Sequence, residues 1–511
     1  MSIAREQALP IQGFRGLDKS SPFTVPGLTR SLLNVEVREG RVIGRGGVDF
    51  DSTFSAVMSE NIQALMPYVA TSGAVTLLRI GPTKVEKSTG GAWTDITGTA
   101  LTGASTDIPQ WAMFRDVLYF TNYGQDRMRY WNGSGNTTEI ATGPWARGIL
   151  SYYGFLFALY TSEDGTAFEP RRALYSEDPQ NDWTLCEGNE LNFHETQGAI
   201  TTGAVFGRTA LVLKEDGVVY LRWIGGPVRF SQELAKGAPG TLSPLGGQSI
   251  GEKGYLYLGT DYQLWIATAN DIIPMPPKVN DILRNDLYRT DVKYCRSCLN
   301  EEKNIYSLFF PLDSTGNKGR IVLNYNTGEF SYSQYDSHGW DAMEAFRWAY
   351  TSPVSMVGAV DTSVYTLDVN TVKADETSAS AETAVSRYYD TDWLQYANMN
   401  EGRVMQAAAQ FTGAGLVFDS SNYAKVAISV ALDHKNEFRF RKVYDLRKKH
   451  VNDEYTTVRY DLPPVQCEWV NLRIELFPSV TENPVLRAGW LYFIPQPDKR
   501  DINRGGSVSE D

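Results

Sequence analysis

Short runs of β-branched and aromatic residues recur in pairs along the chain, and turn-forming residues separate the two members of each pair. In the clearest pair, Val, Leu, Tyr, Phe and Thr at residues 117–121 precede turn-forming residues at 122–126 and a second run at residues 128–131. Such a pattern is typical of a β-hairpin. Six further pairs follow the same plan: 75–80 with 83–86, 155–160 with 172–176, 210–214 with 217–223, 254–259 with 262–266, 304–310 with 320–325, and 357–360 with 363–367.

The spacing of these pairs predicts a β-propeller. Successive pairs begin roughly 38 to 55 residues apart, which is the length of a four-stranded propeller blade. About six or seven such blades fit between residues 51 and 375. The fold class is therefore predicted to be all-β, with the propeller as its larger part.

A second β-domain is predicted over residues 376–496. Its runs alternate strictly, as in residues 469–476, where Val, Leu, Ile and Leu alternate with Trp, Asn, Arg and Glu. This alternation indicates strands with one buried face and one wet face. Several strands of this kind in succession favour a β-sandwich: 387–393, 404–412, 426–432, 437–443, 455–460, 469–476 and 488–494.

The segments outside these two domains contain mostly polar or turn-forming residues. Residues 373–384 are small and polar without strand periodicity, and we interpret them as the linker between the domains. The polar end of the chain, residues 497–511, is interpreted as a flexible tail, or as an arm that becomes ordered on a partner.

Residues 1–50 do not follow the blade pattern. Pro10, Pro22 and Pro26 predict an extended arm laid over another surface. Residues 31–47 then predict a strand, a Glu-Gly turn and a second strand. This hairpin either seals the propeller or serves, with the arm, in docking to other subunits.

Length and composition agree with a large all-β protein. The chain of 511 residues exceeds one ordinary core, and its 28 Tyr suit strands that are apolar on one face and wet on the other. No apolar run reaches the roughly 18 to 20 residues that span a bilayer, and the first residues lack the layout of a signal peptide. The 4 Cys do not form a disulfide framework, which favours synthesis in a cytoplasm.

The charge balance bears on possible partners. A net charge of -12 argues against a protein whose whole surface grips nucleic acid. The same charge suits a surface along which a polyanion slides without sticking.

Cysteine and histidine positions predict neither a metal site nor a catalytic centre. Cys295 and Cys298 form an isolated Cys-x-x-Cys. A structural zinc site would need two further ligands, and a redox motif would need a βαβ context, and neither is visible here. No Gly-x-Ser-x-Gly, phosphate-binding Gly-rich loop or His-Glu-x-x-His is present. The remaining cysteines and all histidines stand apart from one another: Cys186, Cys467, His194, His338, His434 and His450. We therefore predict no catalytic residue, no metal ligand and no cofactor.

A suitably spaced pair of carboxylates would indicate a glycosidase, because some glycosidases are β-propellers. The segments 162–166 and 176–183 are similar to the Asp-containing turns of sialidase-like propellers, but their spacing differs and no arginine cluster accompanies them. A catalytic pair would require two carboxyls about 5 to 10 Å apart in a groove. Glycoside hydrolysis remains the less favoured alternative.

One basic cluster interrupts this acidic chain. It comprises Arg439, Arg441, Lys442, Arg447, Lys448 and Lys449, followed by His450. On a regular strand Arg439 and Arg441 share a face, and residues 447–449 would lie on the loop that follows the strand. The cluster is a candidate interaction patch for DNA phosphates or an acidic neighbour. The alternative is an ordinary solvated face.

The arm and the blades together resemble the tail nozzle proteins of short-tailed bacteriophages, a family that includes the packaged-DNA stabilisation type. Four short motifs, followed by Tyr-rich blades, carry the resemblance: Ser21-Pro22-Phe23, Val25-Pro26-Gly27, Asn34-Val35 before the turn at Gly40, and Arg45-Gly46-Gly47.

The resemblance implies a structural protein of the phage tail, synthesised in the host cytoplasm and assembled into a hexameric ring. Such a ring attaches to the tail adaptor or portal ring, meets tail fibres or tailspikes, retains packaged DNA and provides the channel for its ejection. DNA would pass without sequence specificity, so we expect acidic loops to line the channel, since many cationic contacts would retard exit. Residues 1–50 and the tail after Pro495 are the candidate docking segments between subunits or rings. An alternative is a receptor-binding tail propeller that holds host glycans on exposed aromatic side chains.

Overall fold

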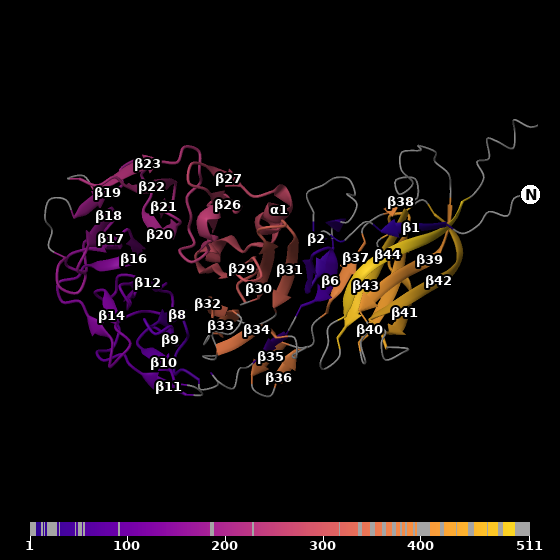
Figure 1. Ribbon diagram of the computed structural model, residues 1–511, viewed down its shortest axis with the longest axis horizontal. Helices are drawn as coiled ribbons and strands as arrows, with labels where there is room; N and C mark the ends of the chain where they lie inside the picture. The colour runs from indigo at the N-terminus through magenta and orange to yellow at the C-terminus, as the bar shows by residue number, and fades with distance from the viewer. Residues whose placement is uncertain are drawn as a thin grey trace, which may run out of the picture.

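The computed structural model of the chain describes residues 7–11, 14, 16–17, 28–29, 31–45, 47–49, 54, 57–89, 92–183, 189–226, 229–315, 317–335, 340–347, 353–359, 364–369, 375–378, 381–383, 386–391, 394–395, 409–419, 424–435, 437–447, 454–467, 469–478 and 484–495. These residues are mostly β-strand, and they form a ring of sheets and a two-layered body beside it (Figure 1). The predicted all-β class, with a propeller and a sandwich, is confirmed. Within this part of the chain no helix is long and apolar enough to cross a membrane.

Among the described residues the ring consists of seven sheets, in each of which the strands of the blade pair antiparallel, so the upper end of the predicted blade number is correct. We number these blades 1 to 7 along the chain. Blade 1 contains β8 (Ala64–Val69), β9 (Val75–Ile80), β10 (Val85–Ser88) and β11 (Trp93–Asp95). Blade 2 contains β12 (Gln110–Phe114), β13 (Val117–Thr121), β14 (Arg129–Trp131) and β15 (Thr138–Glu139). Blade 3 contains β16 (Trp145–Tyr152), β17 (Phe155–Ser162), β18 (Glu169–Ser176) and β19 (Glu190–Asn192). Blade 4 contains β20 (Ile200–Phe206), β21 (Thr209–Lys214), β22 (Val218–Trp223) and β23 (Phe230–Leu234). Blade 5 contains β24 (Gln248–Ser249), β25 (Tyr255–Leu258), β26 (Leu264–Ala267) and β27 (Ile272–Pro274). Blade 6 contains β28 (Arg296–Asn300), β29 (Ile305–Pro311), β30 (Lys318–Asn324) and β31 (Phe330–Tyr335). Blade 7 contains β32 (Trp340–Arg347), β33 (Pro353–Ala359) and β34 (Val364–Val369).

Each predicted hairpin forms the second and third strands of one blade. In blade 2, for example, β13 and β14 pair so that Leu118 lies opposite Trp131. These central strands carry the strongest apolar pattern because both of their faces are covered by neighbouring blades. Every residue of β21 in blade 4 and of β29 in blade 6 is buried.

The first strand of each blade lies at the centre of the ring and contacts the first strand of the next blade. These contacts run from β8 through β12, β16, β20, β24 and β28 to β32, and β32 contacts β8 again. The fourth strand of blade 7 comes from the other end of the chain. It is β7 (Gly47–Asp49), which pairs antiparallel with β34. The ring is therefore closed by a strand that precedes blade 1.

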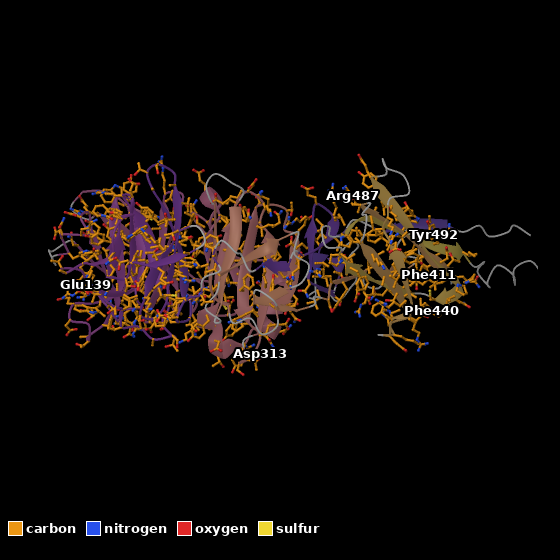
Figure 2. All side chains as sticks on the ribbon, turned by 90° about the horizontal axis from the view of Figure 1, so that it is seen from below. Glu139, Asp313, Phe411, Phe440, Arg487 and Tyr492 are labelled. Atoms are coloured by element: carbon orange, nitrogen blue, oxygen red, sulfur yellow. The ribbon has the colours of Figure 1, made fainter. Side chains whose placement is uncertain are left out.

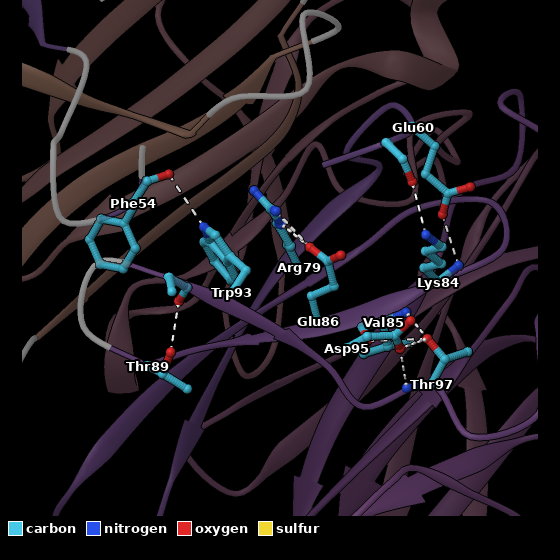
Figure 3. A network of polar contacts seen from close by, with 12 residues as sticks. Phe54, Glu60, Arg79, Lys84, Val85, Glu86, Thr89, Trp93, Asp95 and Thr97 are labelled. Carbon is cyan, nitrogen blue, oxygen red and sulfur yellow. Dashed lines mark hydrogen bonds and ion pairs between the residues drawn. The ribbon is translucent and has the colours of Figure 1, made fainter. Parts of the chain in front are cut away.

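A buried polar network reinforces blade 1 next to this closure (Figure 3). The Arg79 guanidinium donates to the Glu86 carboxylate at 2.6 Å and lies 4.1 Å from the centre of the Trp93 ring. The indole of Trp93 donates to the carbonyl of Phe54, 3.3 Å away. Phe54 lies between β7 and β8, in an apolar cluster that also includes Val364 of blade 7. The network thus ties blade 1 to the segment that connects it with the closing strand.

The C-terminal part is a sandwich of two antiparallel sheets. One sheet has the order β42-β39-β44-β6-β5, with β1 beside β44, and the other has the order β4-β37-β43-β40-β41, with β38 beside β43. The strands from the C-terminal part are β37 (Tyr388–Asp390), β38 (Leu394–Gln395), β39 (Ala409–Asp419), β40 (Lys425–Leu432), β41 (Arg439–Asp445), β42 (Tyr455–Cys467), β43 (Trp469–Phe477) and β44 (Val485–Pro495). In β43, Val470, Leu472, Ile474 and Leu476 are buried, as their alternation predicts.

The N-terminal segment supplies strands to both parts of the molecule. These strands are β1 (Gln7–Ile11), β2 (Gly16–Leu17), β3 (Leu28–Thr29), β4 (Leu32–Leu33), β5 (Val35–Arg38) and β6 (Arg41–Gly44), in addition to β7. β1, β4, β5 and β6 belong to the sandwich, whereas β2 and β3 extend blade 6 beyond β31. In Figure 1 the indigo strands β1 and β6 lie among the orange and yellow strands of the C-terminal part.

The predicted hairpin in residues 31–47 is present, with both turn residues in the left-handed region, at φ 51° for Glu39 and 72° for Gly40. Its place in the fold differs from the expectation of a separate arm that ends at residue 50. β6 pairs with β44 of the sandwich, and β7 pairs with β34 of the propeller. Long-range backbone pairing determines these positions, and no local pattern shows it.

The predicted linker at residues 373–384 contains a hairpin instead. β35 (Asp375–Ser378) pairs with β36 (Ala381–Thr383), and β35 also pairs in parallel with β7. The linker prediction was wrong because backbone hydrogen bonds to β7 form a strand from residues without apolar alternation. The predicted tail at 497–511 lies outside the described residues.

Among the described residues, the α-helix α1 (Pro277–Asp286) and the 3-10 helix η3 (Arg289–Tyr294) lie between blades 5 and 6, and the 3-10 helix η2 (Gly251–Lys253) lies within blade 5. Proline at its first position is compatible with a helix start, since that N–H has no helical partner. Val279, Ile282 and Leu283 recur at helical spacing and are fully buried. The sequence interpretation overlooked this helix.

Candidate functional site

The basic cluster lies on β41, which is the edge strand of its sheet. Arg439, Arg441 and Lys442 are exposed there, as is Arg447 just beyond it. Lys448 and Lys449 lie outside the described residues. The structure therefore places four of the six predicted patch residues on one edge of the sandwich.

A β-bulge changes how these cations are arranged. Phe440 has a φ of 55°, and the pairing with β40 shifts so that Val430 faces Arg439 while Ile428 faces Lys442. The prediction that Arg439 and Arg441 share a face was wrong, because the extra residue in the bulge breaks the alternation. Charged residues and a bulge on an edge strand also disfavour pairing with a further strand.

Three of these cations have partners within the sandwich. Arg439 forms an ion pair with Glu437, and Arg441 pairs with Glu475 at 2.6 Å. Lys442 donates to the carbonyl oxygen of Asp461. Because the two arginines are matched by carboxylates, this edge is a weaker attractor of phosphate than the sequence run indicates.

The pair Arg441–Glu475 belongs to a broader surface that we call the sandwich outer face. It comprises Tyr388, Asp390, Phe438, Arg441, Val443, Arg473, Glu475 and Phe477. The Arg473 guanidinium donates twice to Asp390, at 2.8 Å each, and lies between two rings, 4.4 Å from Tyr388 and 4.2 Å from Phe438.

Apolar side chains on the sandwich outer face remain open to solvent. Val443 is 53% exposed and Phe477 is 39% exposed. Arginine and aromatic residues around exposed apolar groups are typical of protein–protein interfaces. Figure 2 shows nearby Phe440, which is 52% exposed, at the end of the molecule opposite Glu139 of blade 2.

The other sheet of the sandwich bears a similar mixture of arginine, acid and tyrosine. Arg487 forms an ion pair with Asp419 and lies 4.9 Å from the Tyr455 ring. Arg459 lies 4.7 Å from the Tyr492 ring and pairs with Asp461 at 2.7 Å. Arg487 and Tyr492 are visible on this end of the molecule in Figure 2. Both outer surfaces of the sandwich therefore combine locally neutralised charges with aromatic rings.

A second exposed surface lies on the propeller, where two turns of blades 3 and 4 meet. Tyr153 stacks on Trp223 with ring centres 5.0 Å apart and planes inclined by 20°. Tyr153 is 55% exposed and its neighbour Ile224 is 58% exposed. We call Tyr153, Trp223 and Ile224 the aromatic platform. The Phe155 ring lies 5.6 Å from the Trp223 ring, and the Arg229 guanidinium lies 5.2 Å from Phe155.

The Asp-containing turns that suggested a sialidase-like propeller have a structural role here. Asp164 accepts hydrogen bonds from the backbone N–H groups of Ala167 and Thr166 and from the Ser162 hydroxyl. These bonds, that from Ala167 first, hold the pKa of Asp164 well below its usual range. A carboxylate held in this way is a poor proton donor for glycoside cleavage.

The cysteines and histidines that the structure describes do not form a centre. Cys295, Cys298 and Cys467 are buried, and burial raises the pKa of the Cys295 thiol to about 12. The His434 ring centre lies 4.8 Å from that of Trp469, with the two planes inclined by 45°. Cys186, His338 and His450 lie outside the described residues. Within the described part of the chain, no group of three or more His, Cys, Asp or Glu side chains is placed to hold a metal ion.

Comparison with known proteins shows similarity to solved structures alone. No family model matches the chain, and no curated protein matches it. The N-terminal part of BBS1, solved in complex with ARL6, aligns with 66% of this chain and 98% of its own length, at 10% identity and a TM-score of 0.41. YCF48 from Cyanidioschyzon merolae aligns with 62% of this chain and 97% of its own, at 9% identity and a TM-score of 0.36. AztD from Citrobacter koseri aligns with 60% of this chain and 97% of its own, at 15% identity and a TM-score of 0.35.

Proposed function

We propose that this chain is a structural subunit of a phage tail nozzle, which assembles as a hexameric ring below the adaptor or portal ring. In this role it is not an enzyme. The ring would hold packaged DNA until ejection, provide its exit channel, and carry contacts to tail fibres or tailspikes. Localisation in the virion tail follows from this role.

The single observation that carries the proposal is the way the N-terminal segment joins the two parts of the molecule. Within a few residues, Val37 donates from its backbone N–H to the Ser331 hydroxyl of blade 6 at 2.9 Å, and β6 pairs with β44 of the sandwich. Arg387 donates to the carbonyl of Arg45 at 3.1 Å. One continuous apolar core also extends from Leu308 of blade 6 to Leu472 of the sandwich. Two domains joined in this way resist separation, as a part that transmits force within a tail must.

The sandwich outer face is the proposed contact with a second copy of the chain. Its ion pairs are already matched, so a partner can cover them without leaving an unpaired charge. Its exposed Val443 and Phe477 then supply apolar area. The motifs of the arm, through their resemblance to nozzle proteins, support the same assembly.

Sedimentation of the purified full chain tests this proposal. The wild type is expected to sediment as a hexamer, and Val443→Asp combined with Phe477→Asp is expected to sediment as a monomer. The matched control is Ile224→Asp on the propeller, which leaves the sandwich unchanged and should remain hexameric. A wild type that is monomeric at high micromolar concentration contradicts the proposal.

A second candidate function is recognition of host glycans, and the aromatic platform favours it. Exposed stacked rings are suited to pack against the apolar face of a sugar ring. Glycan-array binding by the wild type that is lost in Trp223→Ala, and kept in Trp93→Phe, would favour this candidate. Absence of binding on the array would count against it.

A further inference from the structure

A cavity of about 320 Å³ lies on the axis of the propeller. The first strands of blades 1 to 6 contribute to its walls, together with the loop that precedes β24 and with β25. Its lining residues are Pro67, Gln110, Trp111, Ile149, Thr202, Gly203, Pro244, Leu245, Gly247, Gln248, Tyr255 and Ser297. The volume is at the lower end of the range of small-molecule sites, which begins at about 300 Å³.

None of these lining residues, which belong to the described part of blades 1 to 6, carries a charge. A charged ligand would meet no opposite charge among these residues, which disfavours its binding. The walls instead combine hydroxyl and amide groups with the Trp111 and Tyr255 rings and with Pro67 and Ile149. This mixture suits a neutral ligand that has both polar groups and C–H faces.

Several polar groups in the walls are held in position by bonds within the propeller. Gln110 is 3% exposed, and its amide donates to the Thr201 carbonyl at 3.2 Å and accepts from the Thr202 hydroxyl at 3.0 Å. The Gln248 amide donates to the carbonyl of Ser297 at 2.9 Å. These groups are therefore pre-organised across blades 2, 4, 5 and 6, which lowers the entropy cost of binding.

The Tyr255 hydroxyl is the observation that points to a ligand. Tyr255 is 7% exposed, and no hydrogen bond to a described residue contributes to the pKa of its hydroxyl. Burial alone raises the pKa of Tyr255. A Cβ atom on Gly247 would lie 2.4 Å from this oxygen, so glycine leaves the room that the hydroxyl needs. The hydroxyl oxygen is not enclosed, so a molecule in the cavity can reach it and can both donate to it and accept from it.

We propose that the axial cavity binds a small neutral polyol the size of a single hexose. Each ligand hydroxyl both donates and accepts, so it can pair with the Tyr255 hydroxyl and with the Gln248 carbonyl oxygen. The Trp111 ring and Ile149 would contact its C–H groups. This site is separate from the sandwich outer face and from the aromatic platform, so it goes beyond both candidate functions.

Saturation-transfer NMR and titration calorimetry on the full chain test the proposal. The probes are glucose, galactose and N-acetylglucosamine, with glucuronate and glucosamine as charged counterparts. At least one neutral sugar should bind, and both charged sugars should bind more weakly. Tyr255→Phe should lower the affinity for the neutral sugar about three- to tenfold, since the substitution removes one hydrogen bond.

Two control variants locate the bound sugar. Tyr257→Phe removes a hydroxyl from the same strand, but that hydroxyl donates to the Pro239 carbonyl at 3.1 Å and does not line the cavity. It should bind as the wild type does, and so should Trp223→Ala in the aromatic platform. Failure of all three neutral sugars to bind, full affinity in Tyr255→Phe, or loss of binding in Trp223→Ala would each overturn the proposal.

Discussion

Asp49 on β7 pairs with Thr366 on β34, across more than half of the chain. This pairing gives blade 7 its fourth strand and closes the propeller with residues that precede blade 1. Closure by a strand from the far end of the chain removes a free sheet edge. It also makes the stability of the ring depend on the N-terminal segment.

Deletion of residues 1–49 tests this dependence. The deletion removes β7 from blade 7 and removes β1, β4, β5 and β6 from the sandwich, so both parts expose sheet edges and core. We expect the main calorimetric transition to move to much lower temperature or to be lost. The control is deletion of residues 1–6, which precede β1 and should leave the transition in place. An unchanged transition after the longer deletion would show that the ring closes without β7.

The buried ion pair in blade 1 provides a second prediction (Figure 3). The Arg79 side chain is 1% exposed, and Glu86 is its carboxylate partner at 2.6 Å. Glu86→Ala leaves the buried guanidinium without that carboxylate, which is expected to reduce the free energy of unfolding by about 3 kcal/mol. Urea unfolding followed by tryptophan fluorescence measures this loss. Glu437→Ala, which removes the partner of exposed Arg439, is the matched control and should leave the urea midpoint unchanged.

Alkaline pH provides a third prediction. Burial raises the pKa of Tyr220 to about 12, and its hydroxyl donates to the Thr268 carbonyl at 2.9 Å. The folded pKa lies above the unfolded value of about 10, so the stabilisation is complete below pH 10 and is lost between about pH 10 and 12. Stability measured by urea unfolding should therefore decline over this interval, and Tyr220→Phe should decline less steeply. An equal slope in both proteins would contradict the assignment.

The basic edge of the sandwich provides a fourth prediction. Glu475 neutralises Arg441, so Glu475→Ala should free one cation for a phosphate contact. DNA affinity is measured at several salt concentrations. The plot of log K against log salt should then become steeper by about one unit. The double variant Arg441→Ala with Glu475→Ala should return to the wild-type slope. An unchanged slope in Glu475→Ala would contradict the claim that Glu475 keeps Arg441 from contacting DNA.

The sequence predicted the central hairpins well, because their strands are covered on both faces and carry long apolar runs. Leu118 and Phe120 of β13, for instance, are almost completely buried. The first strands of the blades were missed because they line the axis with a mixture of polar and apolar residues. Gln110 and Thr202 are examples, and the axial cavity that they form therefore has no local signature.

Non-local pairing accounts for most of what sequence analysis could not show. The turn at Glu39 and Gly40 is local and was predicted, but the pairing of Val42 with Leu486 is not encoded in either segment alone. The bulge at Phe440 likewise depends on how β41 aligns with β40. That shift separates Arg439 from Arg441, so the basic cluster had a different geometry from the one its spacing predicted.

The most direct test of the proposed role is cryo-electron microscopy of the purified full chain. We predict closed sixfold rings in which each subunit contributes one propeller and one sandwich, with Val443 and Phe477 covered by the neighbouring copy. Particles that remain single subunits at assembly concentrations, or rings in which the sandwich outer face stays open to solvent, would contradict this account.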